Sequence, residues 1–141
     1  MIFGGFEPII DEGAPGGGFI DGWVVPVPTA KRNAYIEHSR PNAKYFLEYG
    51  ANRVVEAFAD DVPKGEVTDF YRAVGAEDGE SVVFSFIEWP DKATRDEAWK
   101  KIMEDERMRP QGDPPFNGKR MFWGGFEKIL DTANARTPVA A

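Results

Sequence analysis

Residues 121–131 read MFWGGFEKILD, and residues 1–11 read MIFGGFEPIID. Aligned without a gap, the two stretches share Met, Gly, Gly, Phe, Glu, Ile and Asp, and every mismatch except Pro8/Lys128 stays apolar. Short runs rich in aromatic and β-branched residues are typical of β-strands. The glycine pair inside each run predicts a β-bulge or the close approach of another backbone or a ligand. The chain therefore carries the same strand twice.

The composition is that of one folded domain, because 141 residues with 42% hydrophobic side chains can bury a core. The net charge of −7 repels phosphate, so we expect no nucleic-acid partner. The absence of cysteine excludes disulfides and cysteine-based zinc sites and fits a reducing cytoplasm, which is the location we expect. No apolar run has the length of a membrane span and the N-terminus lacks a basic region, so we expect neither membrane association nor a signal peptide.

Apolar and β-branched runs predict strands over residues 19–27, 52–59 and 80–89, and a last strand that begins at Met121. Between the second and third of these, residues 68–74 are predicted as a short extended excursion.

Two helices are predicted from apolar residues at helical spacing. The first covers residues 30–49, with Thr29 as its N-cap, and Pro41 predicts a kink or two helical pieces. The second has Asp91 as its N-cap. Its expected buried stripe consists of Ala98, Trp99, Ile102 and Met103.

The element order β-α-β-β-α-β predicts an α+β protein with a ferredoxin-like fold. Residues 80–89 are apolar on both faces of the expected strand, with Val83, Ser85, Ile87 and Trp89 on one side and Val82, Phe84 and Phe86 on the other. Two helices cover only one face of a four-stranded sheet. We therefore expect a homodimer whose sheets pack face to face.

The chain divides into three parts. Residues 1–18 are the extra strand copy and a Gly-rich linker, residues 19–131 the domain, and residues 132–141 a flexible C-terminal tail. Three fates are open for the extra copy. It is disordered, it adds to a sheet edge, or it replaces the last strand of a neighbouring subunit.

Several motifs resemble those of the bacterial YbaA-like family, a domain-of-unknown-function family numbered 1428. They are GWVV at 22–25, DDVPKG at 60–65, VTDF at 67–70, EWP at 88–90 and FNGKRM at 116–121. The resemblance implies a ferredoxin-like protomer in a dimeric α/β barrel, but no particular reaction. The superfamily contains cofactor-independent oxygenases, lactone isomerases, haem-degrading enzymes and binding modules, so the fold alone does not choose among them.

Three titratable residues are candidates for proton transfer. His38 is the only histidine and is either an ordinary helix residue or a proton carrier at a pocket mouth. Glu56 and Asp21 interrupt apolar strands, where a carboxylate must be paired or lie in a polar cavity. Each is either a structural ion-pair partner or a general base with a raised pKa. The arginines considered for such a pair are Arg53, Arg72 and Arg120.

Large aromatic residues form either the core or a ligand pocket between helices and sheet. The pocket candidates are Trp23, Tyr35, Phe86, Trp89 and Trp123. The acidic residues 60, 61 and 69 lack the spacing of a calcium loop, so we expect no metal and no other cofactor.

Two functions are consistent with these residues. The first is a dimeric small-molecule-binding or stress-type module. The alternative is a cofactor-independent enzyme, oxygenase-like or isomerase-like, that acts in a cleft between the helices and the sheet.

Overall fold

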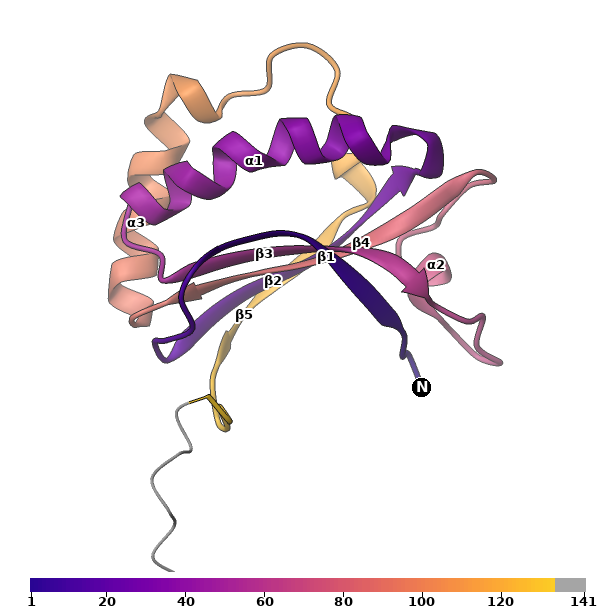
Figure 1. Cartoon of the computed structure of the whole chain (residues 1–141), viewed down its shortest axis with the longest axis horizontal. Coiled ribbons are helices and arrows are strands. Elements are labelled where there is room, and N and C mark those ends of the chain that lie inside the picture. Colours follow the sequence, from indigo (N-terminus) through magenta and orange to yellow (C-terminus); the bar gives the residue numbers. More distant parts are fainter. Residues whose placement is uncertain (134–141) are drawn as a thin grey trace, which may run out of the picture.

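A computed structural model describes residues 1–133 as an α+β protein built on one five-stranded antiparallel sheet (Figure 1). The strands lie in the order β1-β3-β4-β2-β5. Their bounds are Gly5–Gly13 for β1, Phe19–Pro28 for β2, Arg53–Asp61 for β3, Glu80–Trp89 for β4 and Phe122–Glu127 for β5. The helices are α1 (Arg32–Glu48), α2 (Phe70–Ala73) and α3 (Lys92–Glu104). The predicted tail falls mostly outside the described residues.

The two long helices lie on the same face of the sheet (Figure 1). Inward residues of β4 and β2 alternate with outward ones, and Val25 and Val83 pack against Tyr35 of α1. Toward the other end of α1, Ile87 and Trp89 of β4 pack with residues of both long helices. The strand predictions and the division of residues 80–89 into two faces are therefore confirmed.

The opposite face of the sheet is covered only in part. Val24 and Val82 pack against Val74, which directly follows α2, and are almost fully buried. Farther along the same face, Phe84 and Phe122 are 38% and 44% exposed. The chain itself therefore leaves an apolar strip of this face in contact with water.

Helix α1 differs from the prediction at its beginning and middle. Thr29 does not cap it but belongs to a 3-10 turn over Thr29–Lys31, and its hydroxyl pairs with that of Ser81 at 3.2 Å. The helix runs unbroken through Pro41, so the prediction of two helical pieces is wrong. Pro41 is exposed on the solvent side, where water can solvate the carbonyl that its missing N–H leaves unpaired.

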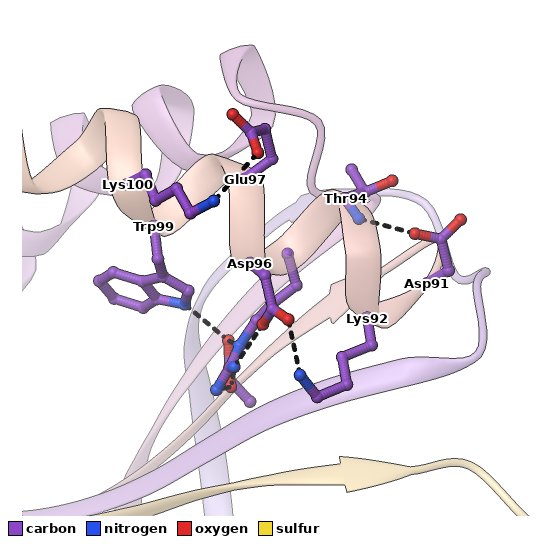
Figure 2. A network of polar contacts seen from close by, with 9 residues as sticks. Asp91, Lys92, Thr94, Asp96, Glu97, Trp99 and Lys100 are labelled. Carbon is purple, nitrogen blue, oxygen red and sulfur yellow. Dashed lines mark hydrogen bonds and ion pairs between the residues drawn. The ribbon is translucent and has the colours of Figure 1, made fainter.

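Helix α3 begins as predicted. The Asp91 carboxylate accepts a hydrogen bond of 2.7 Å from the backbone N–H of Thr94 (Figure 2). This satisfies one of the unpaired donors of the first turn. Ala98 and Ile102 are buried, but Met103 is 74% exposed, so the predicted buried stripe is narrower than expected.

Residues 70–73 form α2 rather than an extended segment. Asp69 caps this short helix by accepting a 2.7 Å hydrogen bond from the backbone N–H of Arg72. A single helical turn carries too little hydrophobic periodicity to be recognised in the sequence.

The first strand copy adds to a sheet edge, which was one of the three fates considered. Strand β1 pairs antiparallel with β3, whereas β5 lies at the opposite edge next to β2. The β2–β5 register is regular, and a Cβ at Gly125 would meet the Phe19 ring at 2.8 Å. Neither role predicted for the second glycine pair is therefore observed, because the close neighbour of Gly125 is a side-chain ring rather than a backbone or a ligand. Within residues 1–133, the helices are all too short or too polar to cross a membrane.

Candidate functional site

A cavity of about 700 Å³ lies between the helix-covered sheet face, α1 and α3. Its surface is mostly apolar, which is typical of pockets that bind small organic molecules. Its wall is formed by Asp21, Trp23, Val25, Tyr35, His38, Ser39, Asn42, Phe46, Glu56, Arg95, Asp96, Trp99, Lys100, Met103, Phe116, Met121 and Trp123.

Glu56 is one of two buried acids in this wall, with 6% of its surface exposed. The phenol of Tyr35 on α1 donates a 2.6 Å hydrogen bond to its Oε2 atom. Ser85 on β4 is the cross-strand partner of Glu56, and its hydroxyl donates to the same oxygen. The position of the Glu56 carboxyl group is therefore fixed by the neighbouring strand β4 and by helix α1.

Burial raises the pKa of Glu56 to about 7, although the hydrogen bonds from Ser85 and Tyr35 act in the opposite direction. The free energy needed to remove a carboxylate from water is larger than the free energy gained from hydrogen bonds with two neutral donors. Burial, with the nearby Glu56 carboxylate, also raises the pKa of the Tyr35 phenol well above its usual value. At neutral pH, Tyr35 is a hydrogen-bond donor and Glu56 is divided between its acid and its carboxylate.

His38 lies on α1 in the wall of the same cavity. It is half-buried, and its ring contacts the edge of the Phe116 ring with centroids 5.5 Å apart. Burial lowers the pKa of His38 from 6.5, so the imidazole is mainly neutral at pH 7. The cavity thus holds a neutral imidazole beside Glu56, whose pKa is about 7.

Asp21 on β2 is the second buried carboxylate and pairs with Arg95. Arg95 of α3 donates to both of its oxygens, at 2.6 Å from Nη2 and 3.0 Å from Nε. The indole N–H groups of Trp89 and Trp99 donate to Oδ2 at 3.0 and 2.9 Å. Figure 2 shows Trp99 projecting from α3, and its indole N–H is one of these two donors. The cluster ties α3 to the sheet at one end of the cavity.

The structure brings together all three proton-transfer candidates, since His38, Glu56 and Asp21 line one cavity. Among the predicted aromatic pocket residues, it places three in the wall: Trp23, Tyr35 and Trp123.

Two predicted pocket residues lie elsewhere. Trp89 is fully buried in the core beneath α1, where it contacts Phe46 edge to face. Phe86 faces the opposite side of the sheet, because its side chain alternates with that of Ser85.

The residues that hold the two carboxylates were missed in the sequence. Glu56 has Tyr35 and Ser85 as partners, and Asp21 has Arg95, so none of the three arginines considered pairs with either. Ser85 had a readable signal, because it is a small polar residue on the inward face of an apolar strand. The Arg95–Asp21 contact spans 74 positions of sequence and had none.

Within residues 1–133, no three His, Asp or Glu side chains gather closely enough to hold a metal ion. Of the acidic residues once considered as cation ligands, Asp69 is the α2 cap described above.

The fold and the cavity define an α+β protein with a small-molecule-sized pocket between helices and sheet. Residues 18–118 match the sequence model of the family described as "Protein of unknown function (DUF1428)". The chain is 54% identical over 114 residues to "Uncharacterized protein YbaA" of Escherichia coli strain K12, which covers 80% of this chain and 97% of that protein. The YbaA protein of Shigella flexneri matches with the same identity and coverage. The chain belongs to the DUF1428 family.

Proposed function

We propose that this chain binds a small, mostly apolar molecule in the cavity and that Glu56 exchanges a proton with it. The observation that carries this proposal is a buried carboxyl group, on the wall of an apolar cavity, with a pKa of about 7. A group with a pKa near the ambient pH both gives and accepts protons efficiently.

The hydrogen bonds around Glu56 indicate which of its two oxygens exchanges a proton with the bound molecule. Both donors, Tyr35 and Ser85, end on Oε2, so Oε1 receives neither. As an acid, Oε1 carries the proton and donates to a bound molecule. As a carboxylate, it accepts a proton from that molecule. Neutral His38 in the same wall is the second group that can take up or supply a proton.

These groups favour a cofactor-independent, isomerase-like enzyme over a module that only binds. Moving a proton between a carbon and the neighbouring carbonyl oxygen needs an acid and a base and leaves the electron count unchanged. Three cavity tryptophans, Trp23, Trp99 and Trp123, suit an aromatic ketone or lactone as the substrate class.

The binding step is tested with 3,4-dihydrocoumarin, an aromatic lactone with hydrogens next to its carbonyl. We expect it to quench tryptophan fluorescence to saturation. Met103→Trp enlarges an exposed wall residue and should weaken binding by at least about tenfold, because it fills the entrance. Phe86→Leu, on the opposite face, is the matched control and should leave the affinity unchanged. Affinity lost in the control and kept in Met103→Trp would place the probe outside the cavity.

The proton-exchange step is measured on the same probe in D₂O. We expect the protein to speed deuterium entry next to the carbonyl, and Glu56→Gln to slow it by about 10²-fold or more while binding stays within a few-fold. Glu104→Gln, an exposed residue on α3, should behave as wild type. Saturable binding of the probe without faster deuterium entry would contradict the enzymatic role. The protein would then be a module that only binds small molecules.

We infer further that residues 19–131 form a ferredoxin-like protomer and that two protomers pack through the sheet face opposite the long helices. The strand order β3-β4-β2-β5 within these residues supports the first inference. The exposed strip of Phe84, Phe122 and Phe126 on that face supports the second.

This association predicts a mass of twice 15.7 kDa in light scattering at micromolar concentration. Phe84→Glu should shift the mass to that of one chain, because it buries an unpaired charge between the sheets. Val67→Glu, at an apolar residue that is 87% exposed and does not belong to this strip, should not. A single-chain mass for the wild type would contradict the association.

A further inference from the structure

Two acids in the wall of the cavity already have close cationic partners. Asp21 is paired with Arg95, as described above. Asp96 accepts hydrogen bonds from Lys92 at 2.6 Å and from Arg95 at 2.9 Å. The Arg95 guanidinium is therefore engaged by both acids. Neither acid is left to attract a positively charged ligand, and this arginine is not available to a negatively charged one.

Lys100 of α3 is a second cation in the wall, and it is held only loosely. Its ammonium group lies 3.5 Å from the Glu97 carboxylate, and the two side chains are 75% and 61% exposed (Figure 2). An ion pair that is this exposed contributes little free energy, because water screens both charges. The ammonium group can therefore leave Glu97 for a negative group of a bound molecule at little cost.

Asn42 provides a neutral donor from the facing helix. It lies one turn of α1 after His38 and lines the same cavity. It is half-buried, and its side-chain amide takes part in no hydrogen bond among residues 1–133. An amide N–H₂ group and an ammonium group, presented by two helices on either side of a cavity, are suitable donors for a carboxylate.

The two ends of the cavity differ in depth. Glu56 is almost fully buried at the sheet, whereas Lys100 and Met103 on α3 are mostly exposed. A molecule whose carbonyl group meets Glu56 and whose body lies along the apolar wall has its other end near Lys100. A carboxylate at that end keeps part of its hydration, so it avoids most of the cost of burying a charge.

We propose that the ligand of this cavity is an aromatic oxo acid, with its ketone carbonyl at Glu56 and its carboxylate bound by Lys100 and Asn42 at the outer wall. The proposal rests on the proposed function and narrows its substrate class from ketones and lactones in general to an anion. A local cation is necessary for such a ligand, because the net charge of −7 repels anions at long range.

The test uses 4-oxo-4-phenylbutanoate, an aryl ketone that has hydrogens next to its carbonyl and a carboxylate at its other end. Its methyl ester is the matched neutral probe. Quenching of tryptophan fluorescence gives the dissociation constant of each. At low salt we expect the wild type to bind the acid at least about tenfold more tightly than the ester. This preference should become smaller as salt is added.

Lys100→Met keeps the length of the side chain and removes its charge. It should weaken binding of the acid by about tenfold and leave binding of the ester within about twofold of the wild type. Lys101→Met is the matched control, because it removes the same charge from the next residue of α3, which is exposed and lies outside the wall. It should leave both dissociation constants unchanged, so the pair separates a local contact from long-range attraction.

Two further variants act on the same contact. Glu97→Gln removes the carboxylate that competes for Lys100, so the acid should bind several-fold more tightly and the ester as before. Asn42→Ala removes the amide donor and should weaken binding of the acid alone by several-fold. Equal affinities for acid and ester in the wild type, or equal losses in Lys100→Met and Lys101→Met, would overturn the proposal.

A failure of this proposal can be told apart from a failure of the proposed function. If 3,4-dihydrocoumarin binds and exchanges protons but the acid has no preference over its ester, the cavity takes a neutral molecule and only the oxo-acid assignment fails. If 3,4-dihydrocoumarin, the acid and the ester all leave the fluorescence unchanged, the proposed function fails as well.

Discussion

Arg95→Ala is expected to lower the free energy of unfolding by about 3–5 kcal/mol. Arg95 donates to both oxygens of Asp21, whose side chain is 3% exposed. Without the guanidinium, the two indole donors remain, but the negative charge stays buried and unpaired. Urea unfolding at pH 7, followed by tryptophan fluorescence, measures the change.

The matched control lies on the same helix. Lys92 forms an ion pair with Asp96 at 2.6 Å, but the two side chains are 64% and 41% exposed. Lys92→Ala should therefore cost no more than about 0.5 kcal/mol. The double variant Asp21→Asn with Arg95→Met should recover part of the loss, because no charge is left in the interior. A cost for Arg95→Ala as small as that for Lys92→Ala would contradict the assigned role of Asp21.

Glu56 should make the protein less stable as the pH rises from about 4.5 to 7. A glutamate has a pKa of 4.5 when unfolded, and burial raises the pKa of Glu56 to about 7 in the fold. The folded state binds the proton of Glu56 more tightly than the unfolded state does. Protonated Glu56 therefore adds its full stability below the pKa of the unfolded state, and this stability is lost as the pH rises through the pKa of the folded state. At about 1.4 kcal/mol per tenfold difference in proton affinity, the loss approaches about 3 kcal/mol.

Glu56→Gln isolates this contribution, because its amide does not titrate. The difference in unfolding free energy between wild type and Glu56→Gln should fall by about 3 kcal/mol over that range and be flat above it. His38 has an opposite pH dependence, since burial lowers its pKa, but it is present in both proteins and cancels. Carboxylates with lowered pKa values, such as Asp11 and Glu80, act below pH 4.5 and also cancel. A difference independent of pH would mean that Glu56 is ionised throughout.

Most of the fold could be predicted because its signals are local. The third predicted strand matches β4, and the alternation of Ser85 and Phe86 assigned their faces correctly. Helix α3 was found through the Asp91 cap. The interruption of apolar strands by Asp21 and Glu56 identified both buried carboxylates, because a charged residue in such a run needs a special environment.

The partners of those carboxylates could not be predicted, because they depend on how the helices are set on the sheet. Arg95 meets Asp21 only when α3 crosses the beginning of β2, and Tyr35 meets Glu56 only when α1 crosses β3. The position of Trp89 also depends on how the helices pack on the sheet. Its size suggested a pocket, but its place on the inward face near both helices puts it in the core.

The strand repeat was visible in the sequence, but its consequence was not. The first copy had three possible fates, and both copies form strands. Only the sheet order reveals that they occupy opposite edges, where Ile10 is buried and its counterpart Leu130 is exposed.

The most direct test of the proposed chemistry is a pH titration of the glutamate side-chain carboxyl carbons by ¹³C NMR, with and without 3,4-dihydrocoumarin. We predict one resonance with a midpoint near pH 7 that is missing in Glu56→Gln and moves when the probe is added. If every glutamate titrates below about pH 5, or if the probe leaves the Glu56 resonance unmoved, Glu56 does not exchange a proton with a molecule in this cavity.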